Sequence, residues 1–132
     1  MSAIFADSFY FLALLNDRDA AHIKAVEFAA TNRELATTAW VLTEVGDAFS
    51  APENRPAFIE LIDMLRASPD ARVIEASPEL FARGIELFRQ RPDKEWSVTD
   101  CISFIIMSDL GLTEALTGDR HFEQAGFRAL LR

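Results

Sequence analysis

Four acidic residues lie beside apolar segments of the 132-residue chain, at Asp7, Glu44, Asp100 and Asp119. Two like charges about 4 Å apart repel each other by roughly 4 kcal/mol at an effective dielectric of about 20, so gathered carboxylates need a compensating charge. A divalent cation supplies that charge, and carboxylate oxygens are hard ligands that suit Mg²⁺ or Mn²⁺. Such an ion can lower the pKa of a water molecule and orient it against a phosphodiester. The four acids therefore predict a Mg²⁺ or Mn²⁺ site if the fold brings them together.

The elements that must position these acids alternate between strands and helices. Short apolar runs predict strands at residues 3–6, 34–37, 71–74, 114–117 and 127–131. Apolar spacing predicts helices at residues 8–15, about 20–31, 39–49, 56–68 and 78–91, and a last one that Ser97 or Thr99 caps and Gly111 ends. Strands that alternate with helices indicate a parallel sheet with right-handed crossovers.

Individual residues fix the expected ends and faces of these helices. Thr38 and Ser77 are placed to cap the helices that follow them, because a side-chain oxygen accepts from the free N–H groups of a first turn. In the helix at about 20–31, Ile23, Val26 and Phe28 are expected to face the core.

This arrangement predicts that the four acids meet at one edge of the sheet. Asp7 and Asp119 each follow a predicted strand, and Asp100 begins the helix that leads to the strand before Asp119. Glu44 falls at the edge of the apolar stripe of its helix, as expected for a group that reaches over the rim of a sheet. Ligands of open α/β sheets bind outside the carboxyl ends of the strands.

Each acid also has a purely structural interpretation. Asp7 could cap the helix that starts at residue 8, and Asp100 could favour the dipole of its own helix. Asp119 follows a glycine, as turn acids often do, and Glu44 could form a salt bridge at the rim. Convergence of all four on one edge is what favours a shared site.

Basic and hydroxyl groups near this edge are candidate substrate contacts. The basic residues are Arg89, Arg91, Lys94, Arg120 and His121, of which Arg120 adjoins Asp119 and is the strongest candidate. Arg89 and Arg91 could equally complement the end of their own helix. Ser8 and Thr99, which flank two of the acids, are the candidate hydroxyl contacts.

Composition limits the class of protein. A length of 132 residues predicts one domain over 1–132, and the formal net charge of −8 argues against a general nucleic-acid coat protein. The single Cys101 excludes a disulfide framework and indicates a reducing cytosol. We expect no membrane span and no signal peptide, so a cytoplasmic protein. Eleven phenylalanines and 50% hydrophobic residues suggest a covered partner surface.

The ordered motifs resemble a known family. They are Ile4-Phe5-Ala6-Asp7-Ser8, Thr38-x-x-Val41-Leu42-x-Glu44, Ser97-x-Thr99-Asp100 and Leu116-Thr117-Gly118-Asp119-Arg120-His121-Phe122. Their order and spacing resemble the PIN domain, and more narrowly the VapC-type ribonuclease toxins of toxin–antitoxin pairs. The resemblance covers nearly the whole chain. It departs from many relatives at Phe9, where they carry a small polar residue.

The resemblance implies an α/β protein with a three-layer α/β/α fold and a mostly parallel central sheet of four to five strands. It also implies a metal-dependent endoribonuclease that uses Mg²⁺ or Mn²⁺, with Asp7, Glu44, Asp100 and Asp119 as its acidic site. An RNA substrate, a homodimer and a VapB-like antitoxin belong to the same implication. The helix that carries Phe58, Ile59, Ile62 and Met64 is a candidate for a self-complementary contact or an antitoxin groove.

Two alternatives remain open at this point. One is a catalytically silent PIN-like binding or scaffold module, and the other is a housekeeping PIN nuclease without an antitoxin. The absence of Asp-x-Asp after the first predicted strand argues against a haloacid-dehalogenase-type phosphatase.

Overall fold

A computed structural model describes residues 3–132 and places a five-stranded parallel sheet at the centre of the molecule. The strands are β1 (Ile4–Ala6), β2 (Leu35–Thr38), β3 (Ala71–Ile74), β4 (Glu114–Leu116) and β5 (Arg128–Ala129). Their order in the sheet is β3-β2-β1-β4-β5, and every neighbouring pair is parallel. The expectation of a mostly parallel sheet of four to five strands is confirmed.

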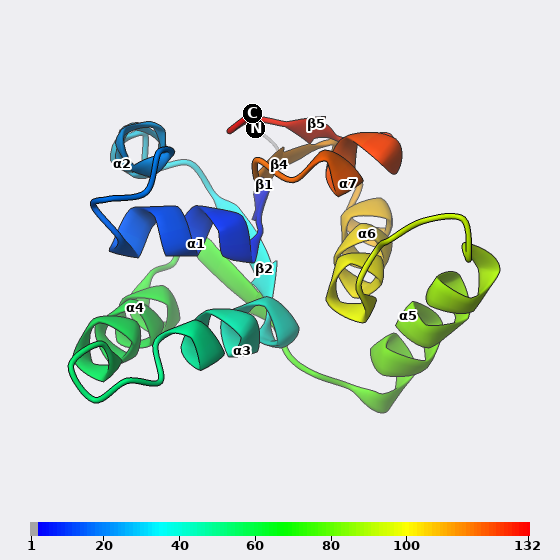
Figure 1. The fold of residues 1–132 in the computed structure, drawn as a ribbon, viewed down its shortest axis with the longest axis horizontal. Coiled ribbons are helices and arrows are strands. Elements are labelled where there is room, and N and C mark those ends of the chain that lie inside the picture. The colour runs from blue at the N-terminus through cyan, green and yellow to red at the C-terminus, as the bar shows by residue number, and fades with distance from the viewer. Residues whose placement is uncertain (1–2) are drawn as a thin grey trace.

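Helices cover both faces of the sheet. They are α1 (Ser8–Leu15), α2 (His22–Ala30), α3 (Ala39–Ala48), α4 (Arg55–Ala67), α5 (Pro78–Gln90), α6 (Val98–Leu110) and α7 (Arg120–Gln124). Figure 1 shows α1 to α4 on one side of the sheet and α5 to α7 on the other, which gives the expected three layers. The side changes because the chain runs from β1 outwards to β3 and then returns across the sheet to β4.

The return of the chain makes β1 and β4 neighbours at the centre. Phe5 pairs with Ala115 and Ala6 with Leu116, so the two strands end side by side. The helices that leave them lie on opposite faces of the sheet (Figure 1). The region outside the carboxyl ends of two such strands, called the crevice below, is where open α/β sheets bind ligands. Asp7 and Asp119 are the residues at this crevice.

Local capping explains where the helices begin and end. The side chain of Thr38 accepts from the Val41 N–H at the start of α3, as the sequence predicts. Ser77 accepts from the Leu80 N–H in the same way at the start of α5. Gly111 ends α6 with a φ of 68°, a left-handed conformation that only glycine adopts without strain.

The predicted inward face of α2 is wrong for Ile23 and Val26, whereas Phe28 packs against the core. Ile23 is 72% exposed and Val26 is 44% exposed, whereas Ala25 is fully buried and Phe28 is partly buried. The cause is that α2 packs against α1. The small side chain of Ala25 lets the two helices approach closely, so this face of α2 is the buried one. The imidazole of His22 adds a contact, with Nδ1 2.8 Å from the Ala13 carbonyl oxygen of α1.

The stretch after β4 contains an element that the sequence analysis does not predict, the short helix α7 that follows Asp119. The predicted strand at 127–131 is present as β5 over two of those residues. Within residues 3–132, none of the helices has the length and apolar character that crossing a lipid bilayer requires.

Candidate active site at the carboxyl ends of β1 and β4

The four predicted acids lie on four different elements around this crevice. Asp7 immediately follows β1, Asp119 precedes α7, Asp100 is in the first turn of α6 and Glu44 is in α3. Asp7 and Asp100 are buried, with 5% and 9% of their surface exposed, while Asp119 is half-buried. Their charges are close enough to act on one another, since repulsion from Asp100 and Glu44 raises the pKa of Asp7.

Burial is the main perturbation of Asp7. It raises the pKa of this carboxyl to about 7, and the nearby Asp100 charge adds to the effect. The Thr117 hydroxyl opposes the shift by donating a hydrogen bond of 2.9 Å to Asp7 Oδ2. Asp7 occupies the position before α1 but makes no side-chain capping hydrogen bond, so its interpretation as a helix cap is wrong.

The pKa of Glu44 is also raised, although Glu44 is more exposed than Asp7. Its residue is exposed on α3, yet partial burial of the carboxylate raises its pKa. A hydrogen bond from Ser8 opposes this rise, and repulsion from Asp100 and Asp119 adds to it. The hydroxyl of Ser8, a predicted substrate contact, is thus directed at Glu44.

Asp100 combines a structural role with its place in the acid cluster. Ser97 caps α6 by accepting from the Asp100 N–H at 2.9 Å, and Asp100 Oδ2 accepts from the Ser97 N–H at 3.1 Å. The same Oδ2 lies 3.0 Å from Nδ1 of His121. Thr99, another predicted substrate contact, is half-buried next to Asp100.

Asp119 is fixed by the chain on either side of it. Its N–H donates to the Thr117 hydroxyl at 3.0 Å, and its Oδ1 accepts from the His121 N–H at 2.9 Å. Thr117 therefore contacts both Asp7 and Asp119, and sequence reasoning missed this role. Its signal was a hydroxyl residue at the end of a buried strand, two positions before an acid.

The predicted basic contacts separate into two groups. Arg89 pairs with Glu86, and Arg91 and Lys94 both pair with Asp93, so acids of their own region neutralise these three cations. Arg120 is exposed at the start of α7 and forms no salt bridge within residues 3–132. It is the basic candidate that stays free for a substrate.

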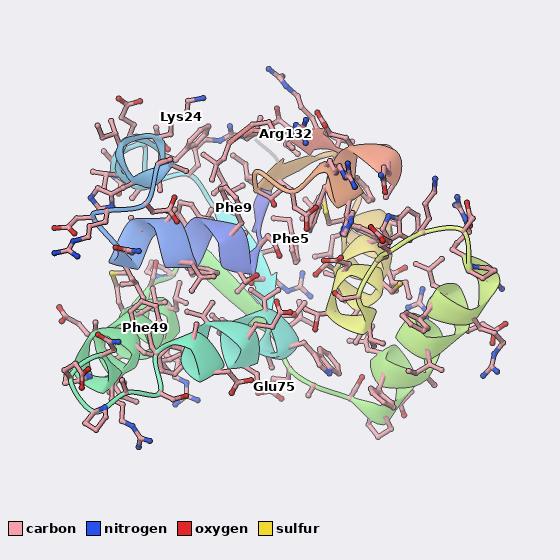
Figure 2. All side chains as sticks on the ribbon, in the orientation of Figure 1. Phe5, Phe9, Lys24, Phe49, Glu75 and Arg132 are labelled. Carbon is pink, nitrogen blue, oxygen red and sulfur yellow. The ribbon has the colours of Figure 1, made fainter. Side chains whose placement is uncertain are left out.

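Phe9 forms an apolar wall beside the acids. A Cβ placed on Gly118 would overlap Cζ of Phe9, so the ring packs directly on the glycine backbone in the turn that carries Asp119. Figure 2 shows Phe9 on the first turn of α1, close to the end of β1. The residue that departs from the family pattern therefore supports the turn between β4 and α7.

The donor set fits a hard divalent cation. Within residues 3–132, neither arginine nor lysine forms a salt bridge with any of the four carboxylates. Asp100, Asp119 and His121 each offer a ligand atom, and these three atoms lie within 4.8 Å of one another. Carboxylates that repel one another without a compensating arginine or lysine are suited to Mg²⁺ or Mn²⁺.

Comparisons with known proteins agree with this geometry. The crystal structure of Mycobacterium tuberculosis VapC20, a toxin that cleaves the sarcin-ricin loop, is similar with a TM-score of 0.84 and 27% sequence identity. The match covers 95% of this chain and 96% of VapC20. No curated protein matched the sequence. The family model of the PIN domain matches residues 4–128, nearly the whole chain, and the chain therefore belongs to the PIN domain family.

Proposed function

We propose that this protein is a metal-dependent endoribonuclease, the toxin of a VapBC-like type II toxin–antitoxin pair. The observation that carries the proposal is the meeting of Asp7, Glu44, Asp100 and Asp119 at the carboxyl ends of β1 and β4. Membership of the PIN domain family and similarity to the VapC20 toxin support it.

The four carboxylates are the proposed ligands of Mg²⁺ or Mn²⁺. Such an ion, when bound, supplies an activated water and stabilises the leaving oxygen of a phosphodiester. The protein contributes the fixed positions of the ligands, because Thr117 orients Asp7 and the Ser97 backbone orients Asp100. Repulsion among the acids favours occupancy by the ion over the metal-free state.

RNA is the proposed substrate. Arg120 is suited to a phosphate next to the cleaved bond, because it is exposed beside Asp119 and unpaired within the described part of the chain. Ser8 and Thr99 are the proposed hydroxyl contacts beside Asp7 and Asp100. The net charge of −8 does not oppose this, since bound cations offset the acids where RNA approaches.

The proposed partners are a second copy of this chain and a VapB-like antitoxin, in the cytoplasm. Ile59 and Met64 of α4 are 54% and 55% exposed, which supports a covered apolar surface on that helix. Light scattering tests the dimer, and a chain that stays monomeric at high concentration contradicts it. A small DNA-binding protein encoded next to this one favours a toxin over a housekeeping nuclease.

Purified protein and a labelled RNA test the activity. We expect cleavage that requires Mn²⁺ or Mg²⁺, stops with a chelator and is lost in Asp119→Asn. Asp93→Asn is the matched control, because it removes an exposed acid of another region. RNA binding without cleavage by the parent protein would instead favour a silent binding module.

A further inference from the structure

The imidazole of His121 lies between two of the acids. Nδ1 is 3.0 Å from Asp100 Oδ2 and 3.4 Å from Asp119 Oδ1, and the side chain is 19% exposed. The backbone N–H of the same residue donates to Asp119 Oδ1 at 2.9 Å. The His121 ring therefore lies near both acids, closer to Asp100, and its backbone N–H adds a hydrogen bond to Asp119.

Each of these acids uses only one oxygen for contacts within the protein. Asp100 Oδ2 accepts from the Ser97 N–H and faces His121 Nδ1, and Asp119 Oδ1 accepts from the His121 N–H. The other oxygens, Asp100 Oδ1 and Asp119 Oδ2, make no hydrogen bond to the residues that the structure describes. Two acids on different elements thus each keep one oxygen for an outside ligand.

We propose that His121 is a positioning residue that sets the separation and rotation of the Asp100 and Asp119 carboxylates for a divalent cation. The inference rests on the proposed function, because it concerns the same site. In the tautomer that carries its proton on Nδ1, the ring donates to Asp100 Oδ2 and prevents that carboxylate from turning away from Asp119. Donors of this kind hold metal ligands in orientation, and their loss typically weakens metal binding about 10- to 100-fold.

The surroundings of His121 Nδ1 favour positioning over coordination by that atom. Nδ1 faces an oxygen that is already held by the Ser97 N–H, so this atom points into the protein's own hydrogen-bond network. A bound ion would meet the free oxygens of the two acids instead. The backbone contact to Asp119 is independent of the side chain, so substitutions at position 121 test the ring alone.

Calorimetric titration with Mn²⁺ tests the inference on the full chain. We expect His121→Leu, which has no donor, to bind Mn²⁺ about 10- to 100-fold more weakly than the parent protein. His121→Asn carries an amide N–H near the position of Nδ1, so it should restore affinity to within a few-fold of the parent. If His121→Leu does not fold, His121→Phe replaces it, with a ring but no donor.

Each outcome decides between the interpretations. Parental affinity in His121→Leu, or no recovery in His121→Asn, overturns the positioning role. Nitrogen coupling to the Mn²⁺ spins in the parent protein, measured by pulsed electron paramagnetic resonance, also overturns it, because it identifies His121 as a ligand. A parent that binds no Mn²⁺ contradicts this inference together with the metal dependence of the proposed function. A parent that binds Mn²⁺ and never cleaves RNA contradicts the activity alone.

Discussion

Two groups of aspartates in this protein occupy opposite electrostatic environments. At the carboxyl ends of β1 and β4, Asp7 is buried among other acids, and burial raises its pKa to about 7. Beyond the end of α5, Asp93 is exposed and hydrogen-bonded to Arg91, which holds its pKa down at about 2. Asp109 on α6 is similar, because Arg83 forms a two-pronged contact with it and lowers its pKa.

The protein compensates the charges of its acids on the outer surface but not at the crevice. On the outer surface, Asp93 and Asp109 each pair with an arginine of the protein itself, which compensates their charge. At the crevice the described residues supply only hydroxyl, amide and imidazole groups, and the pKa values of Asp7 and Glu44 are raised.

The largest effect is expected for Asp7→Asn in the metal-free protein. The folded pKa of about 7 exceeds the unfolded value, so between about pH 4 and 7 the folded state keeps a proton that the unfolded chain releases. The free energy of unfolding of the parent should therefore fall as pH rises through this window. Asn does not titrate, so the variant should lack this decline and be more stable at pH 8 by on the order of a few kcal/mol.

Denaturant unfolding in a chelator at several pH values measures this prediction. Adding Mn²⁺ should stabilise the parent protein and have little effect on Asp7→Asn, because a ligand stabilises only the state that binds it. If the free energy of unfolding changes with pH in the same way in parent and variant, the pKa of Asp7 is not raised in the folded protein.

A substitution that shifts the turn carrying Asp119 without changing any charge should have the next largest effect. In Gly118→Ala the added Cβ meets the Phe9 ring, and overpacking of this kind costs about 1–3 kcal/mol. We also expect weaker Mn²⁺ binding, because the strained turn carries Asp119. Calorimetry and thermal melts measure the two effects.

Gly111→Ala is the matched control for this prediction. Its φ of 68° makes alanine unfavourable by roughly 1–2 kcal/mol, but nothing lies within 4 Å of the new Cβ. It should lower stability and leave Mn²⁺ affinity unchanged. Equal Mn²⁺ affinities in both variants would mean that the Phe9 contact does not set the position of Asp119.

Arg120→Ala should have a smaller effect, confined to RNA. Losing one phosphate contact should reduce the slope of log affinity against log salt by about 0.7 for a single strand. Binding to labelled RNA in a chelator measures the slope without cleavage. Lys24→Ala is the control, since Figure 2 shows this exposed cation on α2, away from α7. An unchanged slope would assign Arg120 to a role other than phosphate contact.

The smallest effect is expected for Asp93→Asn. The pair with Arg91 is exposed, and solvent screens such pairs strongly. Its contribution is present above the unfolded pKa of about 4 and disappears as pH falls towards 2, the reverse of the Asp7 profile. The melting temperature at pH 7 should hardly move, and Mn²⁺ binding should be unaffected. A large change in either would remove the distinction between the two groups of acids.

Local signals predicted much of this fold because they act within a few residues. Thr38, Ser77 and Ser97 each cap the helix that follows, as their side-chain chemistry requires. The placement of the acids at strand and helix ends was predicted for the same reason, although their metal-binding role stays a prediction. Phe9 was noticed only as a departure, and its contact with Gly118 needed the fold to be seen.

The features that the sequence did not predict depend on contacts between elements that are separate in the chain. Ile23 and Val26 form an apolar pattern, but α2 presents Ala25 to α1, and only the tertiary contact decides which stripe is buried. His121 was recognised from the sequence as a basic group near a phosphate. Its contact with Asp100 links α6 to α7, and no spacing rule within either segment predicts that meeting.

The hydrogen bond from Thr117 to Asp7 joins residues 110 positions apart, and this separation affects when the crevice can exist. During synthesis β1 leaves the ribosome well before its neighbour β4, because two strands and six helices lie between them in the sequence. Until then one edge of the central strand has no partner and Asp119 has not emerged. A chain made only as far as α6 therefore cannot assemble the acidic crevice, because it lacks both Thr117 and Asp119.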